Sequence, residues 1–107
     1  MERGHLIPVV IAGEFGKPRP ALIIQSDAFK YIDSITVLPL TSEYLDAEDC
    51  RVAIQPTPDN SLKHVSYVMV DKASTIRRGK AGTVMGRITD DELAKVARAL
   101  ALFLGFA

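Results

Sequence analysis

Short runs of apolar residues recur along most of this chain, separated by glycine, proline and small polar residues. Such runs between turn signals are typical of β-strands. The pattern predicts strands at residues 5–11, 21–25, 35–40, 51–55, 67–70 and 83–88. Several short strands at this spacing favour a barrel or a sandwich.

Two of these runs, residues 21–25 and 35–40, are largely apolar without strict alternation. A strand of this kind is expected to be buried on both faces. Residues 51–55 alternate between polar and apolar side chains and are expected to be half-exposed. Pro8 interrupts the first run, and because proline lacks a backbone N–H, that strand is expected at a sheet edge or at a bulge. Residues 74–82 look like a basic, glycine-bounded connection.

The apolar period changes near the C-terminus. Thr89 and Glu92 have the spacing of a capping box, which starts a helix, and Gly105 suits the position that ends one. The helix is predicted over residues 90–104, with an apolar stripe made of Leu93, Val96, Ala97, Leu100, Ala101 and Leu104. We therefore expect one domain over residues 1–107, mainly β, with a barrel that this helix closes or covers.

Composition narrows the possible functions only slightly. Thirteen basic and thirteen acidic residues give a net charge of zero, so composition alone does not favour a nucleic-acid partner. A basic site would have to be a local arrangement of residues such as Lys17, Arg19, Lys72, Arg77, Arg78 and Lys80. Scattered charges of this kind are also typical of an ordinary solvated surface.

We expect no membrane segment, since no apolar run approaches the roughly 18 residues that a span needs. The N-terminus lacks the apolar stretch of a signal peptide. Cys50 is the single cysteine, so an internal disulfide is excluded, and a cytoplasmic location is expected. One cysteine and two distant histidines, His5 and His64, form no cluster of metal ligands, and we expect no cofactor.

Arg19 is the first candidate for chemistry. Pro18 and Pro20 flank it where a loop meets the apolar run at residues 21–25. Because proline restricts both its own backbone and that of the preceding residue, this guanidinium is held in an extended segment and suits a phosphate. The alternative is a surface arginine in a stiff turn. Thr41 and Ser42 place two hydroxyls after another apolar run, although hydroxyls are also common turn formers.

Four segments together resemble the MazF/PemK/Kid toxins. They are residues 1–4 (Met-Glu-Arg-Gly), 16–27 (from Gly-Lys-Pro-Arg-Pro to Ser-Asp), 39–42 (Pro-Leu-Thr-Ser) and 71–76 (Asp-Lys-Ala-Ser-Thr-Ile). They occur in the family's order, and the likeness extends over nearly the whole chain.

The resemblance implies an SH3-like barrel with a C-terminal helix, usually a homodimer. It implies a metal-independent endoribonuclease that cuts single-stranded RNA and is inhibited by an antitoxin protein. The family's catalytic positions fall on Arg19, Thr41 and Glu14. The residues expected to contact RNA are Lys17, Ser42, Asp71, Lys72 and Arg77.

The chain departs from the family in its possible proton-transfer groups. Many members have an acidic residue where this chain has His5, and Kid-like members have an arginine where this chain has Met69. The first loop is shorter than usual and holds no histidine. Glu14, Asp71 and Arg19 itself remain open as the general base. His5 and His64 match no catalytic position of the family and are expected to be structural or solvated.

Phe15, in the first loop, could stack on a base or cap the core. Two alternatives to an RNA-cutting enzyme also remain. One is a gyrase poison like CcdB, which shares the fold and acts by binding. The CcdB type ends in Trp-Gly-Ile, whereas this chain ends in Leu-Gly-Phe-Ala and has no tryptophan. The other is a non-catalytic SH3-like interaction module.

Overall fold

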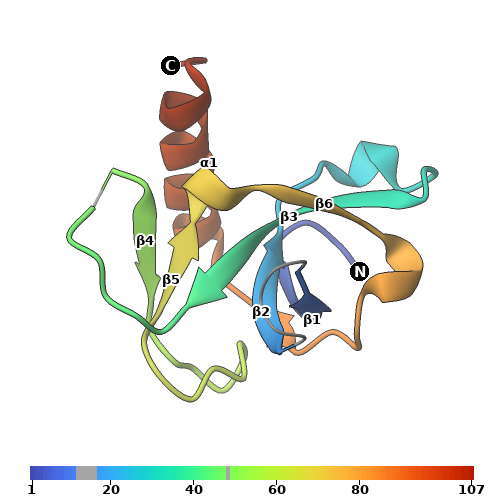
Figure 1. Ribbon diagram of the computed structural model, residues 1–107, viewed down its shortest axis with the longest axis horizontal. Helices are drawn as coiled ribbons and strands as arrows, with labels where there is room; N and C mark the ends of the chain where they lie inside the picture. Colours follow the sequence, from blue (N-terminus) through green and yellow to red (C-terminus); the bar gives the residue numbers. More distant parts are fainter. Residues whose placement is uncertain (12–16, 48) are drawn as a thin grey trace.

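The computed structural model describes residues 1–11, 17–47 and 49–107. Figure 1 shows the strands and the C-terminal helix, which are, in chain order, β1 (His5–Val10), β2 (Pro18–Ile23), β3 (Ser34–Thr41), β4 (Arg51–Ile54), β5 (Ser66–Met69), β6 (Ser74–Arg77), β7 (Gly86–Arg87) and α1 (Asp90–Leu104). Short 3-10 helices are η1 (Asp27–Phe29), η2 (Val70–Lys72) and η3 (Arg78–Lys80).

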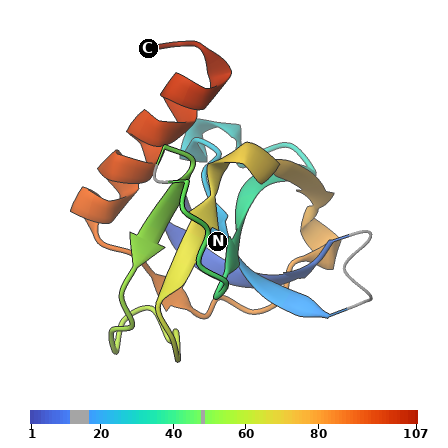
Figure 2. The same cartoon turned by 60° about the vertical axis from the view of Figure 1, so that its left-hand side comes forward.

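The strands form one antiparallel sheet in the order β4-β5-β3-β2-β1-β7, and β6 also pairs with β3. The long strand β3 pairs with three strands: its middle pairs with β2, its first half also pairs with β6, and its last residues pair with β5. The sheet curls into a half-barrel, and α1 lies beside β4 (Figure 2). The expected mainly β fold with a C-terminal helix is confirmed.

The central strands are buried on both faces, as predicted. On β2, Leu22 points to a larger core that includes Val96 of α1. Ala21 and Ile23 point the other way, into a smaller core with Val37 of β3. We call these the helix-side core and the outer core. Alternate residues of a strand face opposite sides of a sheet, so a continuous apolar run supplies both cores.

Pro8 fits the sheet without a bulge. It lies opposite Pro20 in the β1–β2 register, and its carbonyl oxygen accepts from Gly82 N on the other side. Because opposite residues of antiparallel strands alternate between bonded and non-bonded pairs, two prolines are compatible at a non-bonded position. β7 pairs only with the first two residues of β1, so the part of β1 that contains Pro8 lies beyond that pairing, as an edge would.

The helix begins and ends as predicted. Thr89 Oγ1 accepts from Glu92 N at 3.1 Å, and Glu92 Oε1 accepts from Thr89 N at 2.9 Å. Gly105 has a left-handed φ of 82° at the C-cap. The predicted stripe is wrong at its end, since Leu104 is exposed rather than packed on the core. The helix extends past the sheet there, so Leu102, Phe103 and Leu104 have little to cover them.

Two predictions on the strands are also wrong. Residues 74–77, expected to lie in a connection, form β6, and Thr75 pairs with Thr36 through hydroxyls 3.0 Å apart. The strand expected at residues 83–88 is reduced to β7. Arg87 N bonds the Asp59 carbonyl outside the ladder, and Met85 N bonds the Leu6 carbonyl. The chain therefore follows β1 with separate hydrogen bonds rather than a full strand pairing.

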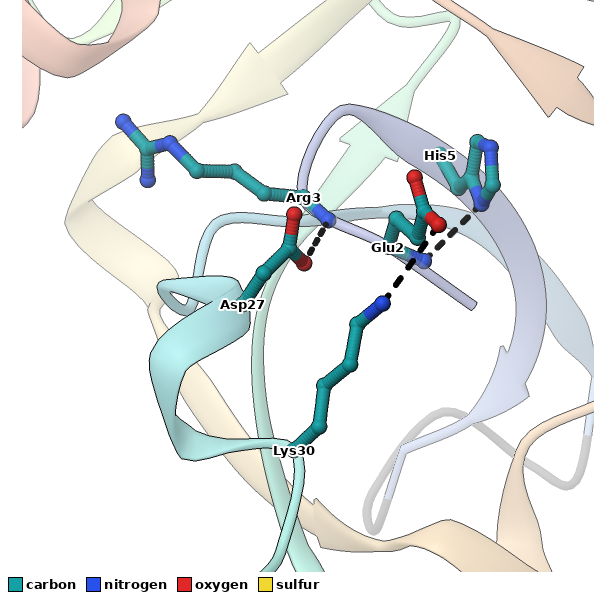
Figure 3. A network of polar contacts seen from close by, with 5 residues as sticks. All are labelled: Glu2, Arg3, His5, Asp27 and Lys30. Atoms are coloured by element: carbon teal, nitrogen blue, oxygen red, sulfur yellow. Dashed lines mark hydrogen bonds and ion pairs between the residues drawn. The ribbon is translucent and has the colours of Figure 1, made fainter.

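Polar contacts fix the N-terminus against η1 (Figure 3). Asp27 Oδ1 accepts from Arg3 N at 2.8 Å, and Lys30 Nζ lies 3.4 Å from Glu2 Oε1. His5 Nδ1 accepts from Glu2 N at 2.9 Å. This histidine therefore has a local structural role. In the described part of the chain, no helix is long and apolar enough to cross a membrane.

Candidate active site

Strand pairing brings Arg19 and Thr41 to the same end of β2 and β3. Ala21 lies opposite Pro39, and Leu22 lies opposite Leu38. Arg19 lies two residues before Ala21 on β2, and Thr41 lies two residues after Pro39 on β3, so both lie at the same end of this strand pair. Two residues far apart in sequence are therefore brought to one end because β2 and β3 form an antiparallel pair.

A cavity of about 480 Å³ opens at this point, and Arg19 and Thr41 both line it. We call it the β2–β3 cavity. Its wall includes the flanking prolines and Ser42 from the first half of the chain. From the second half it includes Ser61, Leu62, Lys63, His64, Ser66 and Met85. The cavity thus combines three cationic or imidazole side chains with several hydroxyls.

A second cavity, of about 250 Å³, also has Arg19 and Thr41 in its wall. We call it the tyrosine cavity. Tyr44 lines it and packs edge-on against Tyr67, with ring centroids 5.7 Å apart. Tyr67 lies opposite Thr41 in the β3–β5 register. The Tyr44 ring is 66% exposed, which leaves it available to stack on a base.

Thr41 has a hydroxyl suited to donation. Its Oγ1 accepts a hydrogen bond from Glu43 N at 3.2 Å. A hydroxyl has one donor proton besides its acceptor lone pairs, and that contact leaves the proton free to point toward a ligand. Arg19 is half-buried and opens to both cavities. Together they can bind a non-bridging phosphate oxygen from two sides.

Of the residues predicted to contact RNA, the structure places some in the walls of these two cavities and others elsewhere. Ser42 lines the β2–β3 cavity, and Lys72 lines the tyrosine cavity. Lys17 is exposed just before β2 and lines neither. Arg77 lies opposite Ser34, seven residues along β3 from Thr41, or about 23 Å at the rise of a strand. One copy of the chain does not bring Arg77 to Arg19.

Asp71 is engaged elsewhere. Its carboxylate accepts from Arg51 at 2.7 Å, and the two side chains are only 24% and 9% exposed. Asp71 therefore positions Arg51, which lines the tyrosine cavity. Its expected direct contact with RNA stays a prediction. Glu14 and Phe15 lie outside the described residues, so their predicted roles also stay predictions.

A third cavity, of about 520 Å³, lies between α1 and β4. Its wall has cations at Arg51, Lys95 and Arg98, but no hydroxyl and no histidine. It is larger than the other two, and its wall also includes the carboxylate of Asp49. In residues 1–11, 17–47 and 49–107, no group of three or more His, Cys, Asp or Glu side chains is placed to hold a metal ion.

Reasoning from sequence missed two features of this site. His64 ends a polar, turn-rich stretch, and its place in the same cavity wall as Arg19 depends on the pairing of β3 with both β2 and β5. Tyr44 lies three residues after Thr41. An exposed aromatic residue just beyond a strand that carries a candidate hydroxyl was the available signal for it.

Comparisons with known proteins agree on one family. The model of the family described as PemK-like, MazF-like toxin of type II toxin-antitoxin system matches residues 2–104. The chain is 41% identical to a probable endoribonuclease MazF of Mycolicibacterium smegmatis, over 100% of this chain and 99% of that protein.

Solved structures show the same fold. An endoribonuclease in complex with its cognate antitoxin, from a mycobacterial species, superposes with a TM-score of 0.79 at 24% identity and covers 100% of this chain and 95% of its own. The Mycobacterium tuberculosis toxin MazF-mt6 gives 0.80 at 21% identity, covering 95% of this chain and 98% of its own.

Proposed function

We propose a function for this chain, which belongs to the family of PemK-like, MazF-like toxins of type II toxin-antitoxin systems. The chain is an endoribonuclease that cuts single-stranded RNA without a metal ion, and a cognate antitoxin inhibits it. The observation that supports this most strongly is the placement of Arg19 of β2 and Thr41 of β3, which line the same cavity.

The chemistry follows from the substrate. RNA has its own nucleophile in the ribose 2′-hydroxyl, and attack on the adjacent phosphorus gives a 2′,3′-cyclic phosphate and a 5′-hydroxyl. The enzyme must then stabilise negative charge on the phosphorane, which is often the largest single contribution to catalysis. Arg19 donates paired hydrogen bonds to the phosphate oxygens, and the Thr41 hydroxyl donates a third.

The RNA lies along the two cavities. The scissile phosphate binds at Arg19 and Thr41, which line both of them. One flanking base enters the tyrosine cavity and stacks on Tyr44, since stacking on aromatic rings is the usual way to bind an unpaired base. Lys72, in the wall of the same cavity, contacts the phosphate backbone of the RNA. The net charge of zero is compatible with this, because the cations are local to the groove.

Digestion of a long, mixed-sequence RNA in EDTA tests the function. The purified protein is expected to cut at short motifs, and the 3′ ends should resist ligation until the cyclic phosphate is removed. An Arg19→Ala protein of equal purity serves as the control for contaminating nuclease. No cleavage by the folded protein, or cleavage that requires added magnesium, would contradict the proposal.

The partners follow from the family and from the surface. We infer a homodimer, since the end of α1 exposes Leu102, Phe103, Leu104 and Phe106, the last of them at 82%, and lone domains rarely leave such apolar patches uncovered. Light scattering should give twice the 11.7 kDa of one chain at micromolar concentration, and a value near 12 kDa would contradict the dimer.

An antitoxin segment with acidic and apolar residues would inhibit the enzyme by occupying the groove, and it would pay its ordering cost on binding. A gyrase poison is not favoured, because the 41% identical relative is named an endoribonuclease. We also place the protein in the cytoplasm, where its RNA substrate is found.

A further inference from the structure

The segment between β4 and β5 carries His64 and is fixed by a buried side chain. Asn60 is 1% exposed. Its Oδ1 accepts from Thr57 N and from Leu62 N, both at 3.0 Å, and its Nδ2 donates to the Gln55 carbonyl at 2.8 Å. A side chain with three such bonds holds the turn in one shape. That shape sets the path of the backbone in the residues that follow Asn60.

Ser61 has a strained backbone beside this anchor. Its φ is +60°, and among the described residues it is the one non-glycine residue with a positive φ. Its hydroxyl donates to the Met85 carbonyl at 2.6 Å, and Leu62 next to it packs into the helix-side core. Strain of this kind persists where the surroundings impose it and tends to occur at functional sites.

The two histidines differ in what surrounds their imidazoles. His5 Nδ1 accepts a hydrogen bond from the chain's own N-terminal segment. The His64 side chain is exposed in the β2–β3 cavity. Its backbone carbonyl accepts from Ser66 Oγ at 3.1 Å, whereas no other described residue hydrogen-bonds its ring. The segment is therefore fixed while the imidazole is open to a ligand.

Acceptors of protons are scarce in the wall of the β2–β3 cavity. Guanidinium and ammonium groups have donors only, which applies to Arg19 and Lys63. No carboxylate lines this cavity among the described residues. An imidazole accepts and releases protons near neutral pH, so His64 is the side chain of this wall with the chemistry of a base.

We propose that His64 is the general base of RNA cleavage. The proposal rests on the proposed function and adds the proton acceptor that the family's pattern leaves open in this chain. It differs from the sequence-based expectation, which considered Glu14, Asp71 and Arg19. Asp71 is bound to Arg51 and lines neither cavity.

The step balances without a metal or a redox partner. The neutral imidazole of His64 takes the proton of the 2′-hydroxyl while the 2′-oxygen forms a bond to phosphorus. The bond from phosphorus to the 5′-oxygen breaks, and its electron pair stays on that oxygen, which takes a proton from water. Arg19 and Thr41 bind the phosphate oxygens throughout, and the imidazolium then returns its proton to solvent.

The test measures single-turnover cleavage by His64→Ala on an RNA that holds one mapped site. General base catalysis is worth about 10²–10⁴-fold, so we expect at least a 10²-fold slower reaction, with partial recovery in added imidazole. His64→Gln, which keeps a polar side chain, should be equally slow. His5→Ala is the matched control and should keep the wild-type rate. Unfolding midpoints confirm that each variant is folded.

A substrate with sulfur in place of the bridging 5′-oxygen separates the base from an acid, because that leaving group needs no proton. The His64→Ala defect should persist on it. Cleavage within threefold of wild type, no imidazole rescue, or a defect that vanishes on the sulfur substrate would each overturn the proposal. Failure of the wild-type protein to cut any RNA would instead overturn the proposed function, so the two failures are distinguishable.

Discussion

The two ends of β3 use polar side chains differently. At its start, Gln25 bonds the backbone of Ser34 and of Thr36, and Arg78 Nε donates to the Ile32 carbonyl at 2.7 Å. Nearby polar groups of the N-terminus and η1 also pair with one another (Figure 3). At its end, Thr41 and Arg19 both line two cavities, one of which His64 also lines.

The two ends of β3 therefore differ in role. Polar groups at its start support the fold, and polar groups at its end are placed for chemistry. Polar groups at the start of β3 bond mainly to backbone, which the fold requires because buried or half-buried backbone groups must find partners. Polar groups at its end converge on open space, with an apolar floor supplied by the cores beneath. Substitutions at the start should therefore change stability, and substitutions at the end should change cleavage.

Of the substitutions that compare the two ends of β3, Arg19→Ala gives the largest expected effect on cleavage. Loss of one preorganised donor to developing charge typically lowers the rate about 10²–10³-fold, and the unfolding midpoint should change little because Arg19 lies outside both cores. Single-turnover rates and thermal unfolding measure the two effects. Lys30→Ala removes a cation at the other end of β3 and should cut RNA normally. Equal cleavage rates for the two variants would show that the two ends of β3 do not differ in their importance for cleavage.

Thr41→Val should have a smaller effect. A hydrogen bond to a charged group contributes about 1.5–3 kcal/mol, which corresponds to roughly 10–100-fold in rate. Valine keeps the shape of threonine and the strand pairing. Thr75→Val is the matched control, since the Thr75 hydroxyl bonds Thr36 at the start of β3. A rate loss in Thr75→Val as large as in Thr41→Val would argue against a donor role for Thr41.

Gly86→Ala tests how the His64 segment is supported. A Cβ at Gly86 would lie 2.1 Å from the Asp59 carbonyl oxygen and 2.8 Å from Asn60 Cα. Such overpacking typically lowers stability by about 1–3 kcal/mol, and the segment that carries His64 should shift. We expect a lower unfolding midpoint together with slower cleavage. Gly79→Ala has open space around its new methyl and should change neither.

Asp27→Ala should have the smallest effect and only on stability. Its carboxylate accepts from Arg3 N at 2.8 Å at an exposed position. A bond of this kind contributes about 1 kcal/mol. Chemical denaturation should register that loss, while the cleavage rate stays within twofold of wild type. A tenfold slower variant would mean that the N-terminal network also supports the site.

Much of the fold could be predicted from the sequence, because local patterns carry it. The continuous apolar runs gave strands with two buried faces, and Thr89, Glu92 and Gly105 gave the limits of α1. β6 was not predicted, because the pattern of apolar residues in its Ser-Thr-Ile-Arg sequence does not indicate a strand. The strand gains stability from its pairing with β3. Leu104 was misplaced because helical spacing does not reveal where the sheet beneath the helix ends.

The site was predicted only in part, for a related reason. Arg19 and Thr41 are candidates from local motifs and from the resemblance, and the structure places both in the wall of one cavity. His64 could not be assigned to them, since its position depends on the strand order β5-β3-β2 and on the turn held by Asn60. Asp71 looked available in sequence, and its ion pair with Arg51 depends on how η2 packs beside β4.

The most direct test of the division along β3 is a nuclear magnetic resonance titration. A short RNA with the mapped cleavage motif and a 2′-O-methyl group at the scissile nucleotide binds without being cut. Added to the isotope-labelled protein, it should shift the amide signals of Arg19, Thr41 and His64, with the signals of Gln25, Asp27 and Ser34 unchanged. Shifts confined to the start of β3, with none around the β2–β3 cavity, would contradict the account.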